Sequence, residues 1–275
     1  MIAVFGSTGT LGTALRKTLK NAKFHTRKDF DVENIRGLEG FLEKFLDGVS
    51  VVINSIAYTN VSLAEKERER CYNINFVFPK ILAEFCERNG IKLIHISTDY
   101  VFDGKVGLYT EDDKPNPISW YGKTKTLSEE AVLSICTNSY VIRTSWVFGE
   151  NGKNFFSTMP LKLIKNEDIY THDEQLVCPT PADFLAKNIL KVLEKSPGIY
   201  HITGKTPITP FEGTVLIKDA IRSNSKIYII KPDLAIRPKT SILLDTKLNI
   251  EKPPFVESIL EYIKTLKTSP SEQLP

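Results

Sequence analysis

The chain has 275 residues, of which 41% are hydrophobic and 25% are charged, and its formal net charge at pH 7 is +3. These values are ordinary for a globular protein with a full hydrophobic core, and the charge is too small and too mixed in sign to indicate a nucleic-acid partner. No window approaches the roughly 18 apolar residues of a membrane span, and the short apolar start lacks a signal peptide's basic leader. We therefore expect a cytoplasmic protein with no membrane partner.

The cysteines are widely spaced and include no CxxC pair. Such spacing favours buried or free thiols over disulfides or a zinc site, so we predict no metal site. The four residues are Cys71, Cys86, Cys136 and Cys178.

A glycine-rich turn follows the first predicted strand, residues 1–5. Gly6, Gly9 and Gly12 are spaced G-x-x-G-x-x-G, and leucines recurring every four residues then predict a helix. A strand, glycine turn and helix in this order form the context of a dinucleotide-binding fingerprint, because the turn brings backbone amides to a pyrophosphate at the helix N-terminus. The bland alternative is a turn without a ligand, and the flanking strand and helix favour the functional interpretation.

The second strand is expected to end near Thr26, and Arg27 and Lys28 come next. An acidic residue here would hold the ribose hydroxyls of NAD, whereas a basic pair suits the 2′-phosphate of NADP. The alternative is a solvated basic turn, and we lean toward NADP. Asp31 and Val32 follow, at a position that could contact the adenine edge.

Helices and strands alternate through the middle of the chain. Helical stripes are predicted in residues 38–45, 72–89 and up to about 134, with Gly90 ending the second. Buried strands are predicted at 49–53, 91–96 and 140–143, and residues 54–59 leave the first of these as a loop. This alternation predicts an α/β fold with a doubly wound, parallel, Rossmann-type sheet.

The pattern loosens beyond residue 147, and prolines become frequent. We predict helices at 155–164, 211–223 and 255–267, strands at 198–202 and 226–230, and a disordered tail from residue 268. Asp183 is expected to cap a helix that runs to Glu194. We therefore predict an NADP-binding Rossmann domain over residues 1–147, completed by segments from about 168–195 and 236–250. Residues 148–275 then form mainly a smaller, loop-rich substrate lobe.

Thr98 lies at the end of the fourth predicted strand, and Tyr121 and Lys125 lie on one face of the next helix. A nearby ammonium would lower the pKa of the tyrosine phenol, which is ordinarily near ~10, and make it a useful proton donor and acceptor. Lys125 could also reach the ribose of a nicotinamide cofactor, while Thr98 holds the substrate oxygen. A Tyr-x-x-x-Lys pair alone is a weak signal, and its position at a strand end of this sheet gives it weight.

Four motifs together resemble extended short-chain dehydrogenases, and more narrowly the dTDP-4-dehydrorhamnose reductases. The match runs from Met1 to about Thr180, with a weaker echo at Arg237-Pro238. The motifs are the turn Gly6 to Gly12, the run Ser97-Thr98-Asp99-Tyr100-Val101-Phe102, the segment Tyr121-Gly122-Lys123-Thr124-Lys125, and the run Arg143-Thr144-Ser145-Trp146.

This resemblance implies reduction of the 4-keto group of a nucleotide-linked deoxysugar, most narrowly dTDP-4-dehydrorhamnose to dTDP-rhamnose. NADPH would be the cofactor, with NADH as the alternative, and Tyr121 would donate the proton. The catalytic residues would be Thr98, Tyr121 and Lys125. The cofactor would be lined by Tyr121, Lys125, Gly6, Thr8, Gly9, Thr10, Leu11, Gly12, Arg27, Lys28, Asp31, Val32, Ser55, Ile56, Ala57, Thr59 and Asn75. The nucleotide-sugar substrate would meet Asp99, Tyr100, Trp146, Gln175, Thr180 and Arg237.

Two of the substrate residues have bland alternatives, since Trp146 could be a core residue and Arg237 a surface charge. The segment that follows the glycine turn departs from the family at one position. Reductases that dimerise through magnesium carry a glutamate two residues after the last glycine of the turn, and this chain has Ala14 there. The resemblance thus does not extend to a metal-bridged dimer, and both a monomer and a homodimer stay open.

Three other functions remain as alternatives. In a dehydratase of the same superfamily, the segment at this strand end resembles Thr-Asp-Glu. This chain has Tyr100 in place of the glutamate. An epimerase retains NAD, which the basic pair at Arg27 disfavours. A non-catalytic regulator resembling that of methionine adenosyltransferase keeps much of the Tyr–Lys segment, but the run at Arg143 is closer to the reductases.

Overall fold

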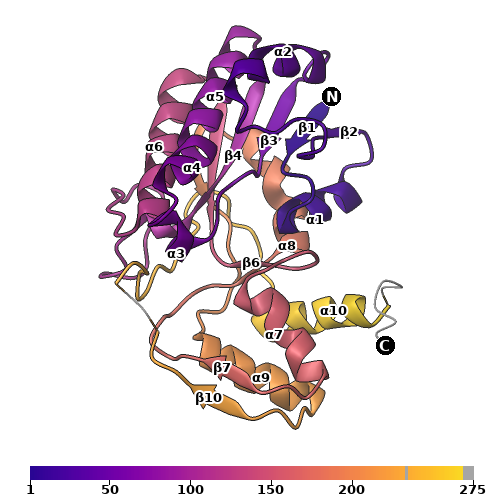
Figure 1. Ribbon diagram of the computed structural model, residues 1–275, viewed down its shortest axis with the longest axis vertical. Helices are drawn as coiled ribbons and strands as arrows, with labels where there is room; N and C mark the ends of the chain where they lie inside the picture. The colour runs from indigo at the N-terminus through magenta and orange to yellow at the C-terminus, as the bar shows by residue number, and fades with distance from the viewer. Residues whose placement is uncertain (233–234, 269–275) are drawn as a thin grey trace.

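The computed structural model describes residues 1–232 and 235–268. Within those residues, six parallel strands form one sheet in the spatial order β2-β1-β3-β4-β5-β9 (Figure 1). The strands are β1 (Ile2–Phe5), β2 (Ala22–Phe24), β3 (Val51–Asn54), β4 (Lys92–Thr98), β5 (Ser139–Thr144) and β9 (Gly198–His201). The chain moves outward from β1 to β2 and returns past β1 to β3, so the winding reverses between β1 and β3. The predicted doubly wound, Rossmann-type sheet is confirmed.

Helices cover both faces of the sheet because successive side chains of a strand point to opposite sides. Phe5 faces a core with Leu38 and Leu82, and Val4 faces another with Leu15 and Leu185. The first face is covered by α2 (Ile35–Phe45), α5 (Phe78–Arg88) and α6 (Trp120–Ile135). The second face is covered by α1 (Thr10–Thr18) and α8 (Ala182–Asn188) (Figure 1).

The helix predicted at 72–89 differs from the observed one at its start. Two short helices, α3 (Val61–Ala64) and α4 (Arg68–Tyr72), precede a π-helical turn, Asn73–Val77, which runs directly into α5. The apolar stripe did not reveal this wider turn because it changes the helical period over only one turn. Such π turns recur at functional sites, and this one carries Asn75.

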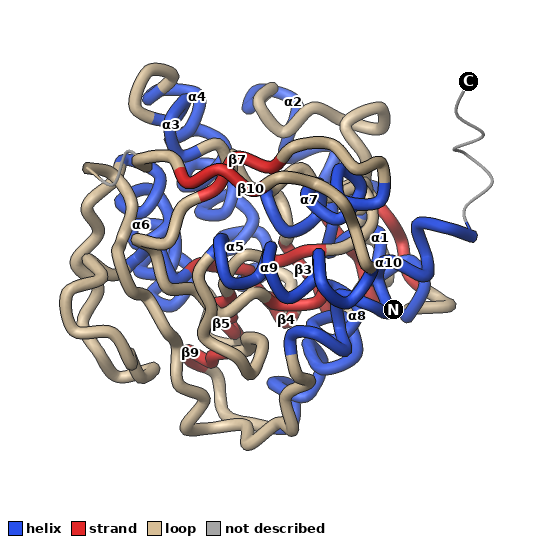
Figure 2. The backbone as a smooth tube through the Cα atoms, turned by 90° about the horizontal axis from the view of Figure 1, so that it is seen from below, coloured by secondary structure: helices blue, strands red, loops and turns tan. Residues whose placement is uncertain are grey.

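A smaller lobe lies below the carboxyl ends of the strands (Figures 1 and 2). Phe156, Leu163, Ile217 and Ile259 form part of its core. Its helices are α7 (Phe155–Ile164), α9 (Pro210–Ile221) and α10 (Phe255–Thr268). Two strand pairs accompany them, β7 (Ile169–Thr171) with β10 (Ile227–Ile229), and β6 (Val147–Phe148) with β8 (Thr180–Pro181).

Two details of this half correct the sequence-based predictions. Asp183 does not cap a helix running to Glu194, because Pro181 is the N-cap of α8 and Asp183 lies in its first turn. The helix ends at Asn188 and continues as a 3-10 helix. The strand predicted at 198–202 joins the main sheet as β9, whereas the one predicted at 226–230 forms a separate pair with β7. The domain boundary at residue 147 stays a prediction.

All four cysteines are buried and free, as their spacing indicates. In the described ranges 1–232 and 235–268, no helix combines the length and the apolar character needed to cross a bilayer. The tail predicted to be disordered lies, from residue 269 onward, outside the described residues.

Candidate active site

The glycine turn connects β1 to α1 in the tight form that the sequence predicts. Gly6 has a φ of +81°, which L side chains rarely adopt. A Cβ atom at Gly12 would lie 2.2 Å from the carbonyl oxygen of Gly6, so only glycine allows α1 to pack this closely on the turn. Gly9 is the exposed N-cap of α1. Glycine has no side chain that could cap the helix, so the first helical amides have no side-chain cap. These amides form a site that suits an anion.

Replacing Gly12 with alanine is expected to displace this turn and to abolish tight dinucleotide binding. The added Cβ would meet backbone atoms of both Gly6 and Ser7, which cannot move aside as a side chain could. Calorimetric titration with NADPH measures the loss. Gly40→Ala is the matched control, because that exposed helical glycine has open space around its Cβ position and should gain about 0.5–1 kcal/mol of stability. Unchanged NADPH affinity in folded Gly12→Ala would contradict the expectation.

A cavity of about 320 Å³ lies beside the loops that follow β2 and β3. The structure brings five of the predicted cofactor residues together in its lining. They are Arg27, Val32, Ile56, Ala57 and Thr59. Tyr58, Asn60, Arg70 and Ile74 complete the lining. The mixture of apolar walls and two guanidinium groups suits an adenosine that carries phosphate.

The two arginines of this cavity share one carboxylate. Glu33 accepts from Arg27 Nη2 at 3.0 Å and from Arg70 Nε and Nη2 at 3.0 and 3.1 Å. Arg70 also contacts Glu67 at 3.4 Å, and Arg27 contacts Asp31 at 3.6 Å. Hydrogen bonds and ionic attraction to Glu33 raise the pKa of Arg70, which keeps this cation charged. Lys28, predicted beside Arg27, is exposed and does not line the cavity.

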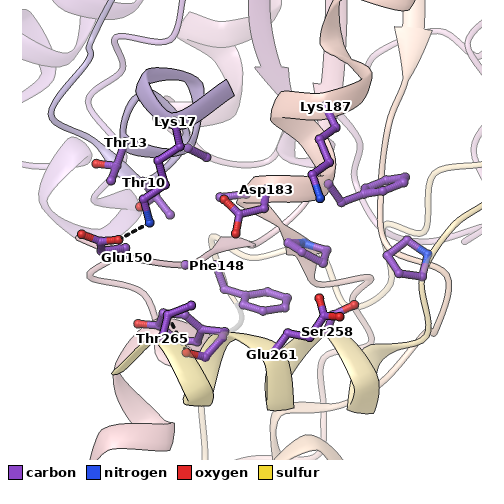
Figure 3. Close-up of a pocket in the computed structure, with 17 residues that line it drawn as sticks. Thr10, Thr13, Lys17, Phe148, Glu150, Asp183, Lys187, Ser258, Glu261 and Thr265 are labelled. Carbon is purple, nitrogen blue, oxygen red and sulfur yellow. Dashed lines mark hydrogen bonds and ion pairs between the residues drawn. The ribbon is translucent and has the colours of Figure 1, made fainter. Parts of the chain in front are cut away.

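Other predicted cofactor residues support the site without lining this cavity. Ser55 donates to the Phe5 carbonyl at 2.6 Å, and Asn75 accepts from the Tyr58 amide at 2.7 Å, so both fix the loop after β3. Leu11 is a buried core residue, while Thr8 is exposed on the turn. Thr10 lines a different cavity, between α1, α8 and α10, together with Lys17 and Glu150 (Figure 3).

Thr98, Tyr121 and Lys125 meet at the carboxyl end of β4. All three are buried, and the Thr98 hydroxyl, which donates to Asp99 Oδ1 at 3.1 Å, is near enough to the Tyr121 phenol to lower its pKa. The Ser119 hydroxyl caps α6 by accepting from the Gly122 amide at 3.0 Å. A Cβ atom at Gly122 would lie 2.2 Å from the Tyr100 carbonyl oxygen, so this glycine lets the first turn of α6 reach the strand end.

Burial controls the acid–base character of the tyrosine and the lysine. Desolvation raises the pKa of Tyr121, and the nearby Thr98 hydroxyl only partly opposes that shift. Desolvation also lowers the pKa of Lys125 to about 8, and its Nζ atom donates to the Ile96 carbonyl at 2.7 Å. Burial therefore outweighs the lowering that the Tyr-x-x-x-Lys spacing predicts, and the pKa of Tyr121 is raised in the free protein. The phenol stays protonated, as a proton donor must.

The substrate side of the site contains an aromatic and cationic group. Tyr100 lies edge-on to Tyr121, with ring centroids 5.7 Å apart. Its hydroxyl accepts from Arg237 Nη1 at 3.1 Å and from Gln175 Nε2 at 3.4 Å. Within the described residues, the buried Gln175 Oε1 and Trp146 Nε1 atoms lack a hydrogen-bond partner. Such groups are costly unless a ligand satisfies them, which supports a polar substrate here.

The side chains of Asp99 and Thr180 are hydrogen-bonded to other side chains of the protein. Asp99 accepts from Ser145 at 2.9 Å and from Ser241 at 2.5 Å, and burial raises the pKa of its carboxyl to about 6. Thr180 is buried and lies 3.4 Å from the Thr144 hydroxyl. These contacts join strand ends to the smaller lobe, and they do not support the predicted contacts of Asp99 and Thr180 with substrate.

Trp146 is neither simply core nor simply exposed. Its backbone has a φ of 43°, which is unusual for a bulky residue, and its ring packs edge-on against Phe156. Strained backbone of this kind concentrates at ligand sites, and the unpartnered indole N–H points to the same interpretation. The predicted substrate contact of Trp146 thus remains a prediction with structural support.

A Rossmann-type sheet, a glycine turn and a buried Thr–Tyr–Lys trio together define an extended short-chain dehydrogenase/reductase. The comparisons place the chain within that class. It belongs to the family described as RmlD substrate binding domain, which matches residues 1–268.

Relatives of known name agree with this membership. The chain is 33% identical over 271 residues to dTDP-4-dehydrorhamnose reductase of Aggregatibacter actinomycetemcomitans, covering 90% of this chain and 91% of the relative. It is 36% identical over 208 residues to the spore coat polysaccharide biosynthesis protein SpsK of Bacillus subtilis, covering 74% and 72%. The predicted family resemblance is confirmed.

Solved structures show the same relationship. A dTDP-4-dehydrorhamnose reductase of Clostridium acetobutylicum superposes with a TM-score of 0.88 at 33% identity, covering 97% of this chain and 99% of that one. The Bacillus anthracis reductase in complex with NADP has a TM-score of 0.87 at 29% identity, covering 96% and 97%. The prediction of an NAD(P)H-dependent oxidoreductase resembling dTDP-4-dehydrorhamnose reductases is confirmed.

Sequence reasoning missed two residues that the structure brings to the site. Arg70 lies in a run of alternating charges from Glu65 onward, which is typical of a solvated surface, so no signal distinguished it. His95 could have been found, because it interrupts the apolar strand that leads to Thr98. A titratable side chain inside a buried strand must have a specific partner.

Proposed function

We propose that this protein reduces the 4-keto group of a nucleotide-linked deoxysugar, most specifically dTDP-4-dehydrorhamnose to dTDP-rhamnose. NADPH is the preferred cofactor, and NADH is the alternative. The observation that carries the proposal is the buried contact between Thr98 and Tyr121 at the end of β4, where Tyr121 is a protonated acid facing the substrate side. The close relatives named as dTDP-4-dehydrorhamnose reductases support the choice of sugar.

The residues divide the work between the two halves of the molecule. When bound, the cofactor supplies hydride; the glycine turn holds its pyrophosphate, and Arg27 holds its 2′-phosphate. Thr98 positions the keto oxygen, and Tyr121 donates a proton to it as charge develops there. Arg237 neutralises the substrate diphosphate, and its contact with the Tyr100 hydroxyl at 3.1 Å supports this role. Residues 1–147 then serve mainly the cofactor, and 148–275 mainly the substrate.

The decay of NADPH absorbance with dTDP-4-dehydrorhamnose tests this proposal directly. Oxidation of one NADPH per sugar reduced is the expected result. NADPH bound but not oxidised with this substrate would overturn the choice of sugar. Interconversion of a nucleotide hexose without net oxidation of NADPH would instead indicate an epimerase. Unmeasurable NADPH binding together with capture of methionine adenosyltransferase would indicate a regulator.

Replacing Arg70 with alanine is expected to weaken NADPH binding by roughly tenfold to a hundredfold, because a charge-assisted hydrogen bond contributes about 1.5–3 kcal/mol. NADH lacks the 2′-phosphate, so its dissociation constant should change little. Calorimetric titrations with both cofactors measure the difference. Arg68→Ala is the matched control, since Arg68 belongs to the same short helix but pairs with Glu65 and lies over Trp120. Equal weakening of both cofactors in Arg70→Ala would exclude a 2′-phosphate contact.

A further inference from the structure

His95 is a wholly buried histidine of β4. It lies two residues before Ser97, on the same face of the strand, and three residues before Thr98. Three side chains contact its ring. Asn54 Nδ2 lies 3.2 Å from Nδ1, while Ser128 Oγ and Lys125 Nζ lie 3.0 and 3.1 Å from Nε2. The ring therefore joins the end of β3 to the helix that carries the catalytic tyrosine and lysine. Nothing in the mechanism above uses it.

The neighbours of His95 fix which ring nitrogen carries the proton. The backbone amide of Ile56 donates to Asn54 Oδ1 at 3.1 Å, so the amide NH₂ of Asn54 must face the ring and donate to Nδ1. With the proton on Nε2, that nitrogen donates to the Ser128 hydroxyl at 3.0 Å, and the hydroxyl gives its own hydrogen to the Lys125 carbonyl at 2.8 Å. The Ser128 contacts are therefore consistent with the tautomer that Asn54 sets. His95 is a neutral imidazole with its proton on Nε2.

This tautomer decides what Lys125 meets. Its Nζ atom donates one hydrogen to the Ile96 carbonyl at 2.7 Å and lies 3.1 Å from the Nε2–H group. A neutral amine can share that hydrogen with Ser128 Oγ in a three-centre bond, accepting it with its lone pair, and still has a hydrogen to offer a cofactor. An ammonium has no lone pair and would set one of its hydrogens against the Nε2 hydrogen. The geometry thus favours the uncharged amine.

We propose that His95 is a positioning residue that holds Lys125 through an Nε2–H donor and disfavours the ammonium form of the lysine in the free enzyme. The inference deepens the proposed reductase function, because it assigns control of the catalytic lysine to a residue outside the Thr–Tyr–Lys trio. Burial, which lowers the pKa of Lys125 to about 8, acts in the same direction.

Other ionisable groups also face Lys125 and must be counted. On its own helix, Glu129 favours the ammonium, but its carboxylate is already held by Arg143 at 2.8 Å. From α4, the Cys71 thiol acts weakly in the same direction, and burial raises the pKa of that thiol so that it stays uncharged. His95 is thus the neighbour that can oppose the ammonium by contact, and it stays neutral because burial lowers its own pKa well below 6.5.

Nitrogen NMR of ¹⁵N-histidine-labelled free protein tests the tautomer, and the chain supplies its own references. The sequence has four histidines. His25 Nε2 lies 2.8 Å from the Phe30 carbonyl and His201 Nδ1 lies 2.8 Å from the Leu244 carbonyl, so these two must carry their protons on opposite nitrogens. His95 is expected to give the Nε2–H pattern of His25 at pH 7. The Nδ1–H pattern of His201 at the His95 resonance would overturn the proposal.

Two variants then test the effect on the lysine, followed by the ¹³Cε shift of labelled Lys125 against pH. Asn54→Asp presents only acceptors, which moves the ring proton to Nδ1 and turns Nε2 into an acceptor for the ammonium. His95→Gln can turn its carbonyl oxygen to Nζ without adding charge. Both are expected to raise the pKa of Lys125 by about one unit or more. Asn89→Asp, which adds the same charge on the exposed end of α5, should leave that pKa unchanged.

An unchanged Lys125 titration in the folded variants would overturn the proposal, as would an equal shift in Asn89→Asp. If either variant fails to fold, the tautomer of the unmodified protein still decides the question. These measurements use no cofactor and no sugar. Their failure is therefore separate from failure of NADPH oxidation with dTDP-4-dehydrorhamnose, which tests the proposed function alone.

Discussion

Replacing Tyr121 with phenylalanine is expected to lower kcat/KM for NADPH-dependent reduction of dTDP-4-dehydrorhamnose by about 10²- to 10⁴-fold, the usual contribution of a positioned general acid. The phenol is buried beside Thr98 and held protonated by a raised pKa. Removing its hydroxyl leaves the developing alkoxide without a proton source. The dissociation constant of NADPH should stay within a few-fold, because the ring and the glycine turn are retained.

Steady-state rates from NADPH absorbance, with NADPH affinity from calorimetry, separate these two effects. Tyr140→Phe is the matched control, since Tyr140 is a buried tyrosine of the sheet. Among the residues that the structure describes, its hydroxyl bonds only to the Lys195 carbonyl, at 3.4 Å. It should keep nearly the full rate. A Tyr121→Phe variant as active as Tyr140→Phe would remove Tyr121 from the chemistry, whatever the substrate.

Replacing Glu129 with alanine is expected to reduce the free energy of unfolding by about 3–5 kcal/mol, the usual cost of leaving a buried charge unpaired. Arg143 is fully buried, and its Nε and Nη2 atoms meet the Glu129 carboxylate at 2.8–3.1 Å. Its remaining Nη1 atom has no partner within the described residues, so the guanidinium depends on this one carboxylate. Chemical denaturation followed by circular dichroism measures the change.

The exposed pair between Arg88 and Glu39 provides the matched control, since both side chains are about half exposed. Glu39→Ala should cost about 1 kcal/mol or less, because solvent screens such pairs. Replacing both members of the buried pair with apolar residues, as in Arg143→Met with Glu129→Leu, should recover much of the loss. Equal losses for Glu129→Ala and Glu39→Ala would show that the buried guanidinium finds another partner.

The sheet was predictable because its signals are local. Each strand is a short apolar run that a glycine or a polar loop ends, and each helix shows a stripe with the period of a helical turn. The glycine turn was predictable for the same reason, since Gly12 must be glycine wherever the helix packs on the turn. The position of Thr98, Tyr121 and Lys125 then followed from the rule that ligands bind at the carboxyl ends of parallel strands.

What escaped prediction depends on contacts between distant segments. Arg70 joins the cofactor cavity only because α4 folds back beside Glu33, which is 37 residues earlier. The predicted substrate contact of Asp99 stays a prediction, and its hydrogen bonds with Ser145 and Ser241 could not be foreseen because they join segments 46 and 142 residues away. The pKa of Tyr121 also differs from the expectation. Helical spacing suggests that Lys125 lowers it, whereas burial raises it.

Two residues beside the candidate active site, Arg237 and Ser241, come from the last sixth of the sequence. Tyr100 is hydrogen-bonded to Arg237 and Asp99 to Ser241, at sequence separations of 137 and 142 residues. During synthesis the ribosome therefore delivers the cofactor half long before these partners emerge, and N-terminal units fold first. A nascent chain ending before Arg237 would lack the cation proposed for the substrate diphosphate. The proposed substrate contacts are thus completed only after residues 237–241 have been made.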